Sequence, residues 1–313
     1  MTAPAALGAL GQQAASTAMR LTLLATMAVW GGNVSLIKQL LTQLDPMLLS
    51  ALRMSVATVT LVLVLRWRGL PWPRLSRRQA WGLLACALIM VTVNQLLFTL
   101  GVQRTAAANA VLIIALNPLV SSLVAAAFLG DRLTPSRLAG VALGFAGVAA
   151  VVLNRPGAVL GQGGLGDLLV FGSVLTWVGG GVMVQRLSRG LDSALVSTIV
   201  VVVGTLPLAA YVLLDPTVPL APLTRLSAFD WLLVLLSSVL ATALGALVWN
   251  RALVQLGVAR TALYAYWVPM FGVAIAVGLL GEPLTPWHGL GLAAVLGGTW
   301  LGTRRPQAAV PGA

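Results

Sequence analysis

Long apolar stretches separated by short polar links dominate the chain. They run, to within a few residues, over 21–40, 47–65, 79–101, 106–128, 136–154, 167–187, 193–214, 229–250, 258–280 and 287–302. A helix needs roughly 20 apolar residues to cross about 30 Å of hydrocarbon at about 1.5 Å per residue. The pattern therefore predicts an all-α protein with ten transmembrane helices.

The composition also indicates that most of the chain lies within a lipid bilayer. Hydrophobic residues make up 59% of the 313 residues and charged residues 8%, whereas about a quarter of a soluble domain is charged. Residues 1–20 lack the basic start of a signal peptide and are predicted to form a loose N-terminal tail. The single cysteine excludes an intrachain disulfide.

The net charge of +12 could indicate binding to nucleic acid, but the basic residues do not alternate with stacking aromatic residues. They flank the apolar stretches instead. With a cytoplasmic N-terminus, fourteen Lys and Arg residues fall on the inner side and four on the outer side, with Arg53 inside a stretch. The positive-inside rule then predicts a multi-pass protein of a bacterial-type inner membrane, with both termini cytoplasmic and no nucleic-acid partner.

The sequence repeats itself at a fixed distance. Leu-Gly-Asp-Arg-Leu-Thr-Pro at 129–135 returns as Leu-Gly-Glu-Pro-Leu-Thr-Pro at 280–286, an offset of 151. At an offset of 147, Leu44-Asp45 returns as Leu191-Asp192. A Pro just inside an apolar stretch, after a polar link, is typical of a helix start. The repeated unit is therefore helical.

Each half contains five predicted helices, an odd number, so the second half enters the membrane from the opposite side. Inverted repeats are typical of carriers with a site near the bilayer midplane, and we expect a central cavity there. A duplicated bundle without a transport role is the alternative. The predicted organisation is an N-terminal tail at 1–20, a first repeat at 21–154, a Gly-rich linker at 155–166, a second repeat at 167–303 and a C-terminal tail at 304–313.

These motifs resemble one known family. Asn117-Pro118 and Val268-Pro269 lie in the fourth helix of each half, the Leu-Gly-Asp or Leu-Gly-Glu motif follows, and a glycine-spaced fifth helix comes next. This order resembles the EamA-type branch of the drug/metabolite transporter superfamily, and the chain is similar to its aromatic amino-acid exporters of the YddG type. The resemblance implies a ten-helix carrier that exports or exchanges small metabolites. It is incomplete at one point, since Arg132 follows the first acid but Pro283 the second.

The ionisable residues give no sign of catalysis. All seven acids lie at the ends of stretches or in links, and the single histidine, His288, lies beside a helix start. Proton-driven carriers commonly hold a carboxylate or histidine within the membrane, so we expect flux to follow the substrate gradient. The spacing offers no metal site and no Ser/His/Asp set, which excludes a metal, a cofactor and an enzyme from the prediction.

Aromatic residues give the first candidates for a binding site. Trp30 and Trp177 occupy matching positions in the two halves, roughly 14 Å into their helices. They either line the cavity, where a ring stacks on a ligand or meets an ammonium, or fill packing space. Further aromatic candidates lie at matching positions or beside the second proline motif: Phe98, Trp249, Tyr264 and Trp267.

Polar residues inside the stretches give the second group, because a polar group in hydrocarbon needs a partner or water. This group comprises Asn33, Asn94, Gln95, Asn109, Asn117 and Asn250. Each either faces a wet cavity or makes a hydrogen bond between helices. Those that share a helix with Trp30, Phe98 or Trp249 are favoured for the cavity.

Pro118 and Pro269 complete the predicted site. Each proline disrupts the hydrogen bond to the carbonyl four residues earlier, so Ile114 and Ala265 are expected to leave an acceptor for a ligand ammonium, or else to mark only a kink. Arg53 lies a third of the way into its helix. We expect it to snorkel to the surface, with anchoring of a carboxylate as the alternative.

The sequence thus predicts an inner-membrane exporter or facilitator that works by alternating access. Amino acids, including aromatic and hydrophobic ones, are the expected substrates. Export of nucleobases, nucleosides or cationic drugs is the alternative, and a non-transporting membrane scaffold is a further one. The expected partners are the small-molecule substrate and the lipid bilayer, and the pattern is compatible with either a monomer or an oligomer.

Overall fold

The structure is a computed structural model. It describes residues 3–69, 75–129, 134–154, 164–187, 191–256, 264–265 and 267–303. Within these residues the chain is helical and contains no strand. The first copy of the Gly-Asp-Arg motif, most of the predicted linker and the C-terminal tail at 304–313 lie outside the described residues.

The first half forms a series of helices with one π-helical insertion. Its elements are α1 (Ala3–Leu40), α2 (Pro46–Trp67), α3 (Arg77–Ala87), η1 (Leu88–Val93), α4 (Asn94–Arg104), α5 (Ala107–Ile114), α6 (Asn117–Leu129) and α7 (Pro135–Leu153). The π-helix η1 joins α3 to α4 without interruption, so the three make one continuous helical run. By contrast, a turn at Ala115 and Leu116 separates α5 from α6.

The second half repeats this layout. Its elements are α8 (Gly164–Leu187), α9 (Ser193–Leu214), the 3-10 helix η2 (Ala221–Arg225), α10 (Ala228–Leu235), the π-helix η3 (Leu236–Leu244), α11 (Gly245–Leu256), α13 (Trp267–Leu280) and α14 (Pro286–Thr303). A π-helix again interrupts the third long run of the half. π-Helices are rare and often lie at functional sites. Because one occurs in each half, η1 and η3 indicate where a functional site lies.

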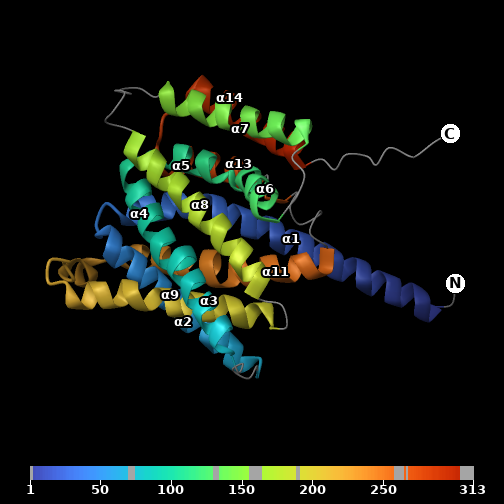
Figure 1. The fold of residues 1–313 in the computed structure, drawn as a ribbon, viewed down its shortest axis with the longest axis horizontal. Helices are drawn as coiled ribbons and strands as arrows, with labels where there is room; N and C mark the ends of the chain where they lie inside the picture. The colour runs from blue at the N-terminus through green and yellow to red at the C-terminus, as the bar shows by residue number, and fades with distance from the viewer. Residues whose placement is uncertain are drawn as a thin grey trace.

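Six helical runs are long and apolar enough to cross a membrane, and three shorter apolar helices accompany them. The multi-pass prediction is therefore supported, and most helix bounds agree with the predicted stretches to within a few residues. The start of α1 differs. Helix α1 begins at Ala3 rather than near Leu21, so the predicted loose tail is helical from Ala3 onward, and this part projects beyond the bundle (Figure 1).

Helix caps explain one of the sequence repeats. Asp45 precedes α2 and accepts hydrogen bonds from the backbone N–H groups of Met47 and Leu48. Asp192 does the same at the start of α9, with Ala194 and Leu195 as donors. The first N–H groups of a helix have no partner inside the helix, and an aspartate at this position satisfies two of them. The repeated Leu-Asp pair is thus a repeated helix start.

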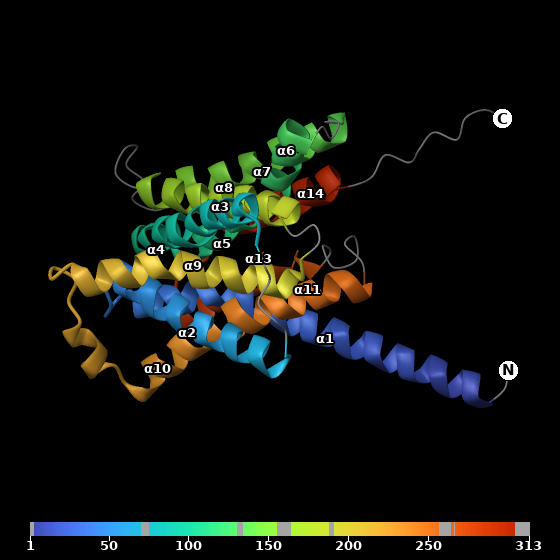
Figure 2. The same cartoon turned by 60° about the horizontal axis from the view of Figure 1, so that its bottom comes forward.

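Glycines bring α7 and α14 into close contact. A Cβ on Gly298 would overlap the carbonyl oxygen of Gly140, and a Cβ on Gly147 would overlap the Cβ of Ala294. These glycines have a scaffold role, because small residues let helix backbones approach closely. Gly31 of α1 packs in the same way against the backbone of α13 at Gly272. Helices from the two halves therefore pair with each other (Figure 2).

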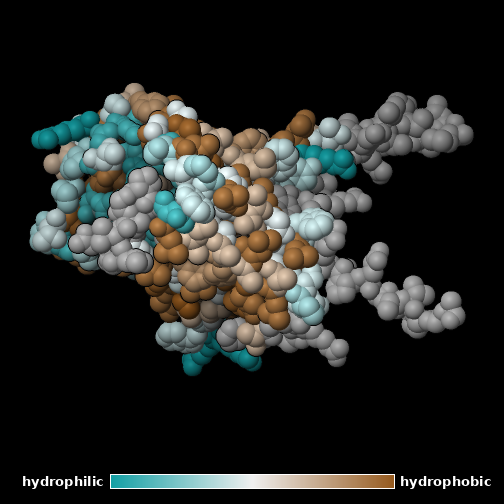
Figure 3. Space-filling model, turned by 90° about the horizontal axis from the view of Figure 1, so that it is seen from above, coloured by the Kyte–Doolittle hydropathy of each residue, from teal (hydrophilic) through white to brown (hydrophobic). Residues whose placement is uncertain are grey.

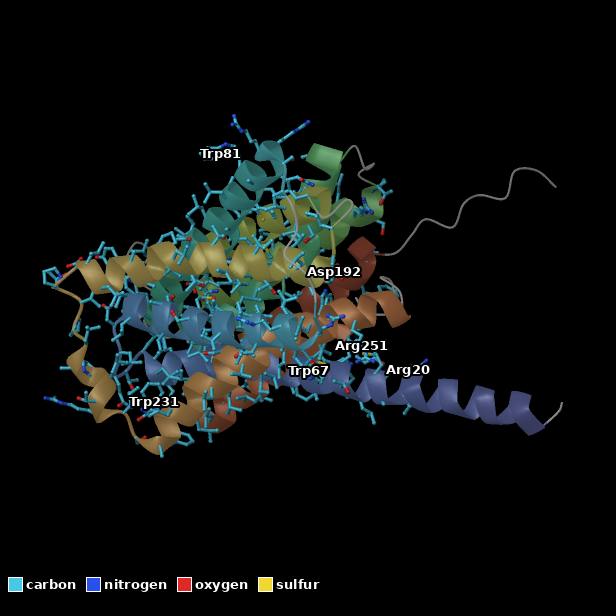
Figure 4. The ribbon with its side chains drawn as sticks, turned by 90° about the horizontal axis from the view of Figure 1, so that it is seen from below. Arg20, Trp67, Trp81, Asp192, Trp231 and Arg251 are labelled. Carbon is cyan, nitrogen blue, oxygen red and sulfur yellow. The ribbon has the colours of Figure 1, made fainter. Side chains whose placement is uncertain are left out.

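The surface of the bundle is divided along its length. Many large hydrophobic side chains are exposed, and they form a brown middle region between more hydrophilic ends (Figure 3). Arg20, Trp67 and Arg251 lie toward the end from which α1 projects, whereas Trp231 lies toward the opposite end (Figure 4). The start of α1 and the end of α14 lie at the same end of the bundle (Figure 1). An even number of crossings gives this arrangement.

Substitution of Gly298 by alanine tests the glycine contact. We expect Gly298→Ala to lower the free energy of unfolding by about 1–3 kcal/mol, because the new methyl group meets backbone that cannot rotate away. Gly289→Ala is the matched control on the same helix, since nothing lies within 4 Å of its Cβ. Thermal melting of the purified protein in detergent measures both. Equal melting temperatures for the two variants would contradict the close α7–α14 contact.

Candidate functional site

Arg53 is the largest fully buried side chain of the described protein. It lies in the first third of α2, and only 2% of its surface is exposed. The expected snorkelling is therefore wrong. A side chain that snorkels has its charged end in water, whereas the guanidinium of Arg53 points into the protein between α4 and η3.

Two polar side chains hold the guanidinium of Arg53. Its Nε donates to Ser237 Oγ at 2.6 Å, and its Nη1 donates to Gln95 Oε1 at 3.3 Å. Its Nη2 makes no hydrogen bond within the described residues. Fully enclosed polar side-chain atoms without a partner are found there only at Ser35 and Asn117.

The contacts of Arg53 continue on both sides into a chain of polar side chains. Ser237 donates to Asn33 Oδ1 of α1. On the other side, Gln95 donates to Asn94 Oδ1 at 3.4 Å, and Asn94 donates to the hydroxyl of Thr176 in α8 at 3.1 Å. We call Asn33, Ser237, Arg53, Gln95, Asn94 and Thr176 the polar chain. It links α1, η3, α2, α4 and α8, and it crosses between the halves three times.

The two π-helices supply groups to the polar chain. Gln95 and Asn94 begin α4 directly after η1, and Ser237 is the second residue of η3. A π-helix forms i→i+5 bonds, which shifts the register of the side chains that follow it. Further along η3, the carbonyl of Ala241 accepts a hydrogen bond from Trp30 Nε1 at 2.8 Å. Gly245 leaves the room that this indole needs.

An aromatic cluster adjoins the polar chain. The rings of Trp30 and Trp249 lie 5.5 Å apart, and both pack with Tyr264 and Phe271 around the buried Leu23 and Met27. Trp30 and Asn33 are three residues apart on α1 and so share a face of the helix. The apolar rings and the hydrogen-bonding groups therefore meet along one side of α1.

A second polar group holds the two halves together at one end of the bundle. Glu282 accepts hydrogen bonds from the first N–H groups of α5, those of Ala107 at 2.7 Å and Ala108 at 3.0 Å. Lys38 donates to the carbonyls of Val102 and Thr105. A carboxylate at a helix start satisfies unpaired donors and favours the helix dipole. The acid of the repeated Leu-Gly-Glu motif thus has a structural role as a cap supplied by the other half.

Asn109 belongs to this end of the bundle rather than to the polar chain. It is buried, and its Oδ1 lies 3.3 Å from Nε2 of His288. The other ring nitrogen of His288 contacts Thr285 at the start of α14. The only described histidine is therefore engaged in helix capping.

The carbonyls at the two prolines are occupied by the protein, contrary to expectation. The carbonyl of Ile114 accepts from the side chain of Asn117 at 2.8 Å, and that of Ala265 accepts from the N–H of Val268 at 3.2 Å. Pro118 and Pro269 lie near the starts of α6 and α13, after a break in the helix. Their position agrees with the preference of proline for the first turn of a helix. The carbonyls of Ile114 and Ala265 are therefore not left free for a ligand ammonium.

The remaining predicted residues are not seen in the polar chain. Trp177 is 48% exposed on α8, and Trp267 is 43% exposed at the start of α13, where it pairs with Phe271. Phe98 packs against the main core. The side chain of Asn250 lies outside the described residues. The structure therefore joins Trp30 to Trp249 and Asn33 to Asn94, but shows no contact between Trp30 and Trp177.

The described acids have partners away from Arg53. They cap helices or bind neighbouring hydroxyl and amide groups: Asp45, Asp167, Asp192, Asp215, Asp230 and Glu282. No group of three or more metal-binding side chains occurs in the described part of the chain. The site is a buried cation with neutral polar neighbours and adjacent aromatic rings.

Repeated apolar helices that enclose such a site define a multi-pass membrane transporter. Comparison with known proteins then gives the family. The EamA-like transporter family matches residues 18–153 and again residues 164–304. The chain belongs to this family, whose members are transporters and not enzymes. The two matches correspond to the two halves seen in the structure.

Individual relatives cover nearly the whole chain. An uncharacterized transporter, YetK of Bacillus subtilis, is 24% identical over 90% of this chain and 85% of its own length. A probable terminal-alkyne amino-acid exporter of Streptantibioticus cattleyicolor is 27% identical over 84% of this chain and 88% of its own. A solved crystal structure with 19% identity has the same fold, with a TM-score of 0.64 over 92% of this chain and 96% of that chain.

Ser237 is the principal residue that the sequence did not indicate. A serine in an apolar helix commonly bonds to a carbonyl of its own helix, as its neighbour Ser238 does with Val234. Nothing local separates Ser237 from Ser238. Only the position of η3 against α2 brings Ser237 to Arg53.

The pair Ser237 and Ser238 provides a matched test of the polar chain. Both hydroxyls are fully buried, but only that of Ser237 joins Arg53 to Asn33. We expect Ser237→Ala to lower the free energy of unfolding by about 1–3 kcal/mol, because it leaves buried polar atoms unpaired. Ser238→Ala removes only a bond within one helix and should cost less than about 1 kcal/mol. Thermal melting in detergent measures both, and a larger loss for Ser238→Ala would contradict the polar chain.

Proposed function

We propose that the protein is an exporter or facilitator of small metabolites that works by alternating access. Its proposed substrates are amino acids, including those with aromatic and hydrophobic side chains. The observation that carries this proposal is the polar chain, which joins the two halves through Arg53 and Ser237 and adjoins the aromatic cluster at Trp30. An ionisable residue within a membrane helix is costly and usually functional.

The proposed architecture is ten membrane-spanning helices in two inverted repeats. Several features support it. The helical elements of the second half follow the order of those in the first, and the start of α1 and the end of α14 lie at one end of the bundle. The proposed substrate site lies between the halves, as in other inverted-repeat carriers. The excess of basic residues in links on the side of the termini supports an inner-membrane protein with both termini in the cytoplasm.

The combination of groups at the site supports amino acids over the alternatives. A guanidinium with neutral partners attracts a carboxylate and repels a cation, which disfavours cationic drugs. The adjoining rings of Trp30 and Trp249 suit an apolar or aromatic side chain. The similarity to a probable terminal-alkyne amino-acid exporter supports the same class. Trp177 stays a candidate for the cavity wall in the second half.

Flux measurements in proteoliposomes test the proposed function. We expect labelled phenylalanine and leucine to move down their own gradients, with initial rates that do not change when a pH or sodium gradient is imposed. The reason is that the described acids lie at helix ends and cap helices or bind loop residues. Empty liposomes are the control. Uphill accumulation driven by protons or sodium would contradict gradient-driven transport, and the absence of flux for every amino acid would contradict the proposed substrate class.

Trp30 variants test the aromatic part of the site. Removal of the ring in Trp30→Ala should lower phenylalanine flux relative to alanine flux about fivefold, which corresponds to a stacking contribution of about 1 kcal/mol. Trp30→Phe keeps a ring but loses the bond to Ala241 and should retain the preference. Trp67→Ala, at an 88% exposed position, is the control. An unchanged flux ratio in Trp30→Ala, with only a lower melting temperature, would show that Trp30 is a packing residue.

A further inference from the structure

We propose that Arg53 binds the carboxylate of the transported molecule and thereby sets the substrate class. That class is monocarboxylates with an apolar or aromatic substituent, amino acids among them. The inference rests on the proposed transport function and adds which group of the substrate is recognised and which residue recognises it. It follows from the charge, burial and hydrogen bonds of the guanidinium rather than from the aromatic cluster.

Arg53 carries a buried positive charge. Arg53 is always protonated in proteins, and only 2% of its surface is exposed. Its partners Ser237 and Gln95 are neutral, and none of the described carboxylates forms an ion pair with it. Burial of a cation in a low-dielectric interior costs several kcal/mol, on the order of what a paired anion returns. The protein supplies no such anion within its described residues, so a ligand anion is the partner that fits.

The hydrogen bonds of Arg53 use only part of its guanidinium group. A guanidinium has five N–H donors in one plane. Ser237 takes the Nε donor and Gln95 takes one donor of Nη1. The other Nη1 donor and both Nη2 donors have no partner within the described residues. Together they form the end of the fork, which binds the two oxygens of a carboxylate side by side. Within the described residues, the neutral contacts thus fix the plane of the guanidinium and leave its carboxylate-binding edge without a partner.

An amino acid also carries an ammonium group, which would need an acidic or carbonyl partner. The described acids are engaged at helix ends, and the carbonyls before Pro118 and Pro269 are bonded within the protein. No charged partner for an ammonium is therefore found near the polar chain in the described residues. The carboxylate is the recognised group, and a ligand without an ammonium should still bind.

Three probes separate these contributions. They are L-phenylalanine, its carboxamide L-phenylalaninamide, and hydrocinnamate, which keeps the carboxylate and lacks the ammonium. Binding to the purified full chain is measured by titration calorimetry, and flux is measured in proteoliposomes. We expect phenylalanine and hydrocinnamate to bind at least about tenfold more tightly than the amide, because charge-assisted hydrogen bonds are lost with the carboxylate.

Gln95→Glu is the decisive variant, because it keeps Arg53 and places a carboxylate at the guanidinium. We expect the melting temperature to be retained or raised, and the preference for acid over amide to fall by about tenfold. Arg53→Gln should lose the same preference if it folds. Arg251→Gln, at an exposed position, is the control and should keep it. If Arg53 is only structural, Gln95→Glu leaves the preference unchanged.

The outcomes also separate this inference from the proposed function. Equal binding and flux of phenylalanine and its amide in the wild type would overturn the role of Arg53 and leave amino-acid transport intact. Absence of binding and flux for all three probes would overturn the proposed function and this inference with it. A preference for phenylalanine over both other probes would show that the ammonium is recognised, which also contradicts the inference.

Discussion

A buried guanidinium with no counter-charge among the described residues is the constraint on which the interior of this transporter depends. Arg53 cannot reach water as an exposed arginine does, and its hydrogen bonds come from elements in both halves of the chain. Loss of either neutral partner would leave a charge unsatisfied in an apolar medium, which costs more than a single surface hydrogen bond. The positions of η3 and α4 relative to α2 are therefore set by a group that also suits a ligand.

The scaffold around this group is built from repeated, locally specified parts. Asp45 and Asp192 start equivalent helices, and glycines pair α7 with α14. These parts are nearly symmetric, but the site is not. At the offset that aligns α2 with α9, Val200 corresponds to Arg53. Duplication of the scaffold thus gives two similar halves, as the proposed alternating access requires, while a single arginine makes the proposed substrate site asymmetric.

Much of the scaffold could be predicted from the sequence because its determinants are local. Apolar length sets the helices, aspartate and proline set their starts, and glycine spacing sets the close contact of α7 with α14. The start of α1 at Ala3 is an exception, since the alanine-rich segment before Leu21 forms helix without a long apolar stretch. Alanine has the highest helix propensity, which explains the extension.

The site was less predictable because it depends on which helix faces meet. Depth along α2 was compatible with snorkelling, and only the packing of α4 and η3 shows that Arg53 is enclosed. The same holds at Pro118, where Asn117 folds back onto the carbonyl that the proline would leave unpaired. Asn33 and Trp30 were indicated by their polarity and position, and the structure places both beside η3. Trp177 matches Trp30 in sequence but is half exposed.

A crystal structure of the protein with bound L-phenylalanine tests the central claim most directly. The account predicts that the ligand carboxylate lies within hydrogen-bond distance, about 3 Å, of Nη2 of Arg53. It also predicts that the phenyl ring lies against the aromatic cluster that contains Trp30. A ligand bound between the halves with its carboxylate away from Arg53, while Ser237 and Gln95 still hold the guanidinium, would contradict it.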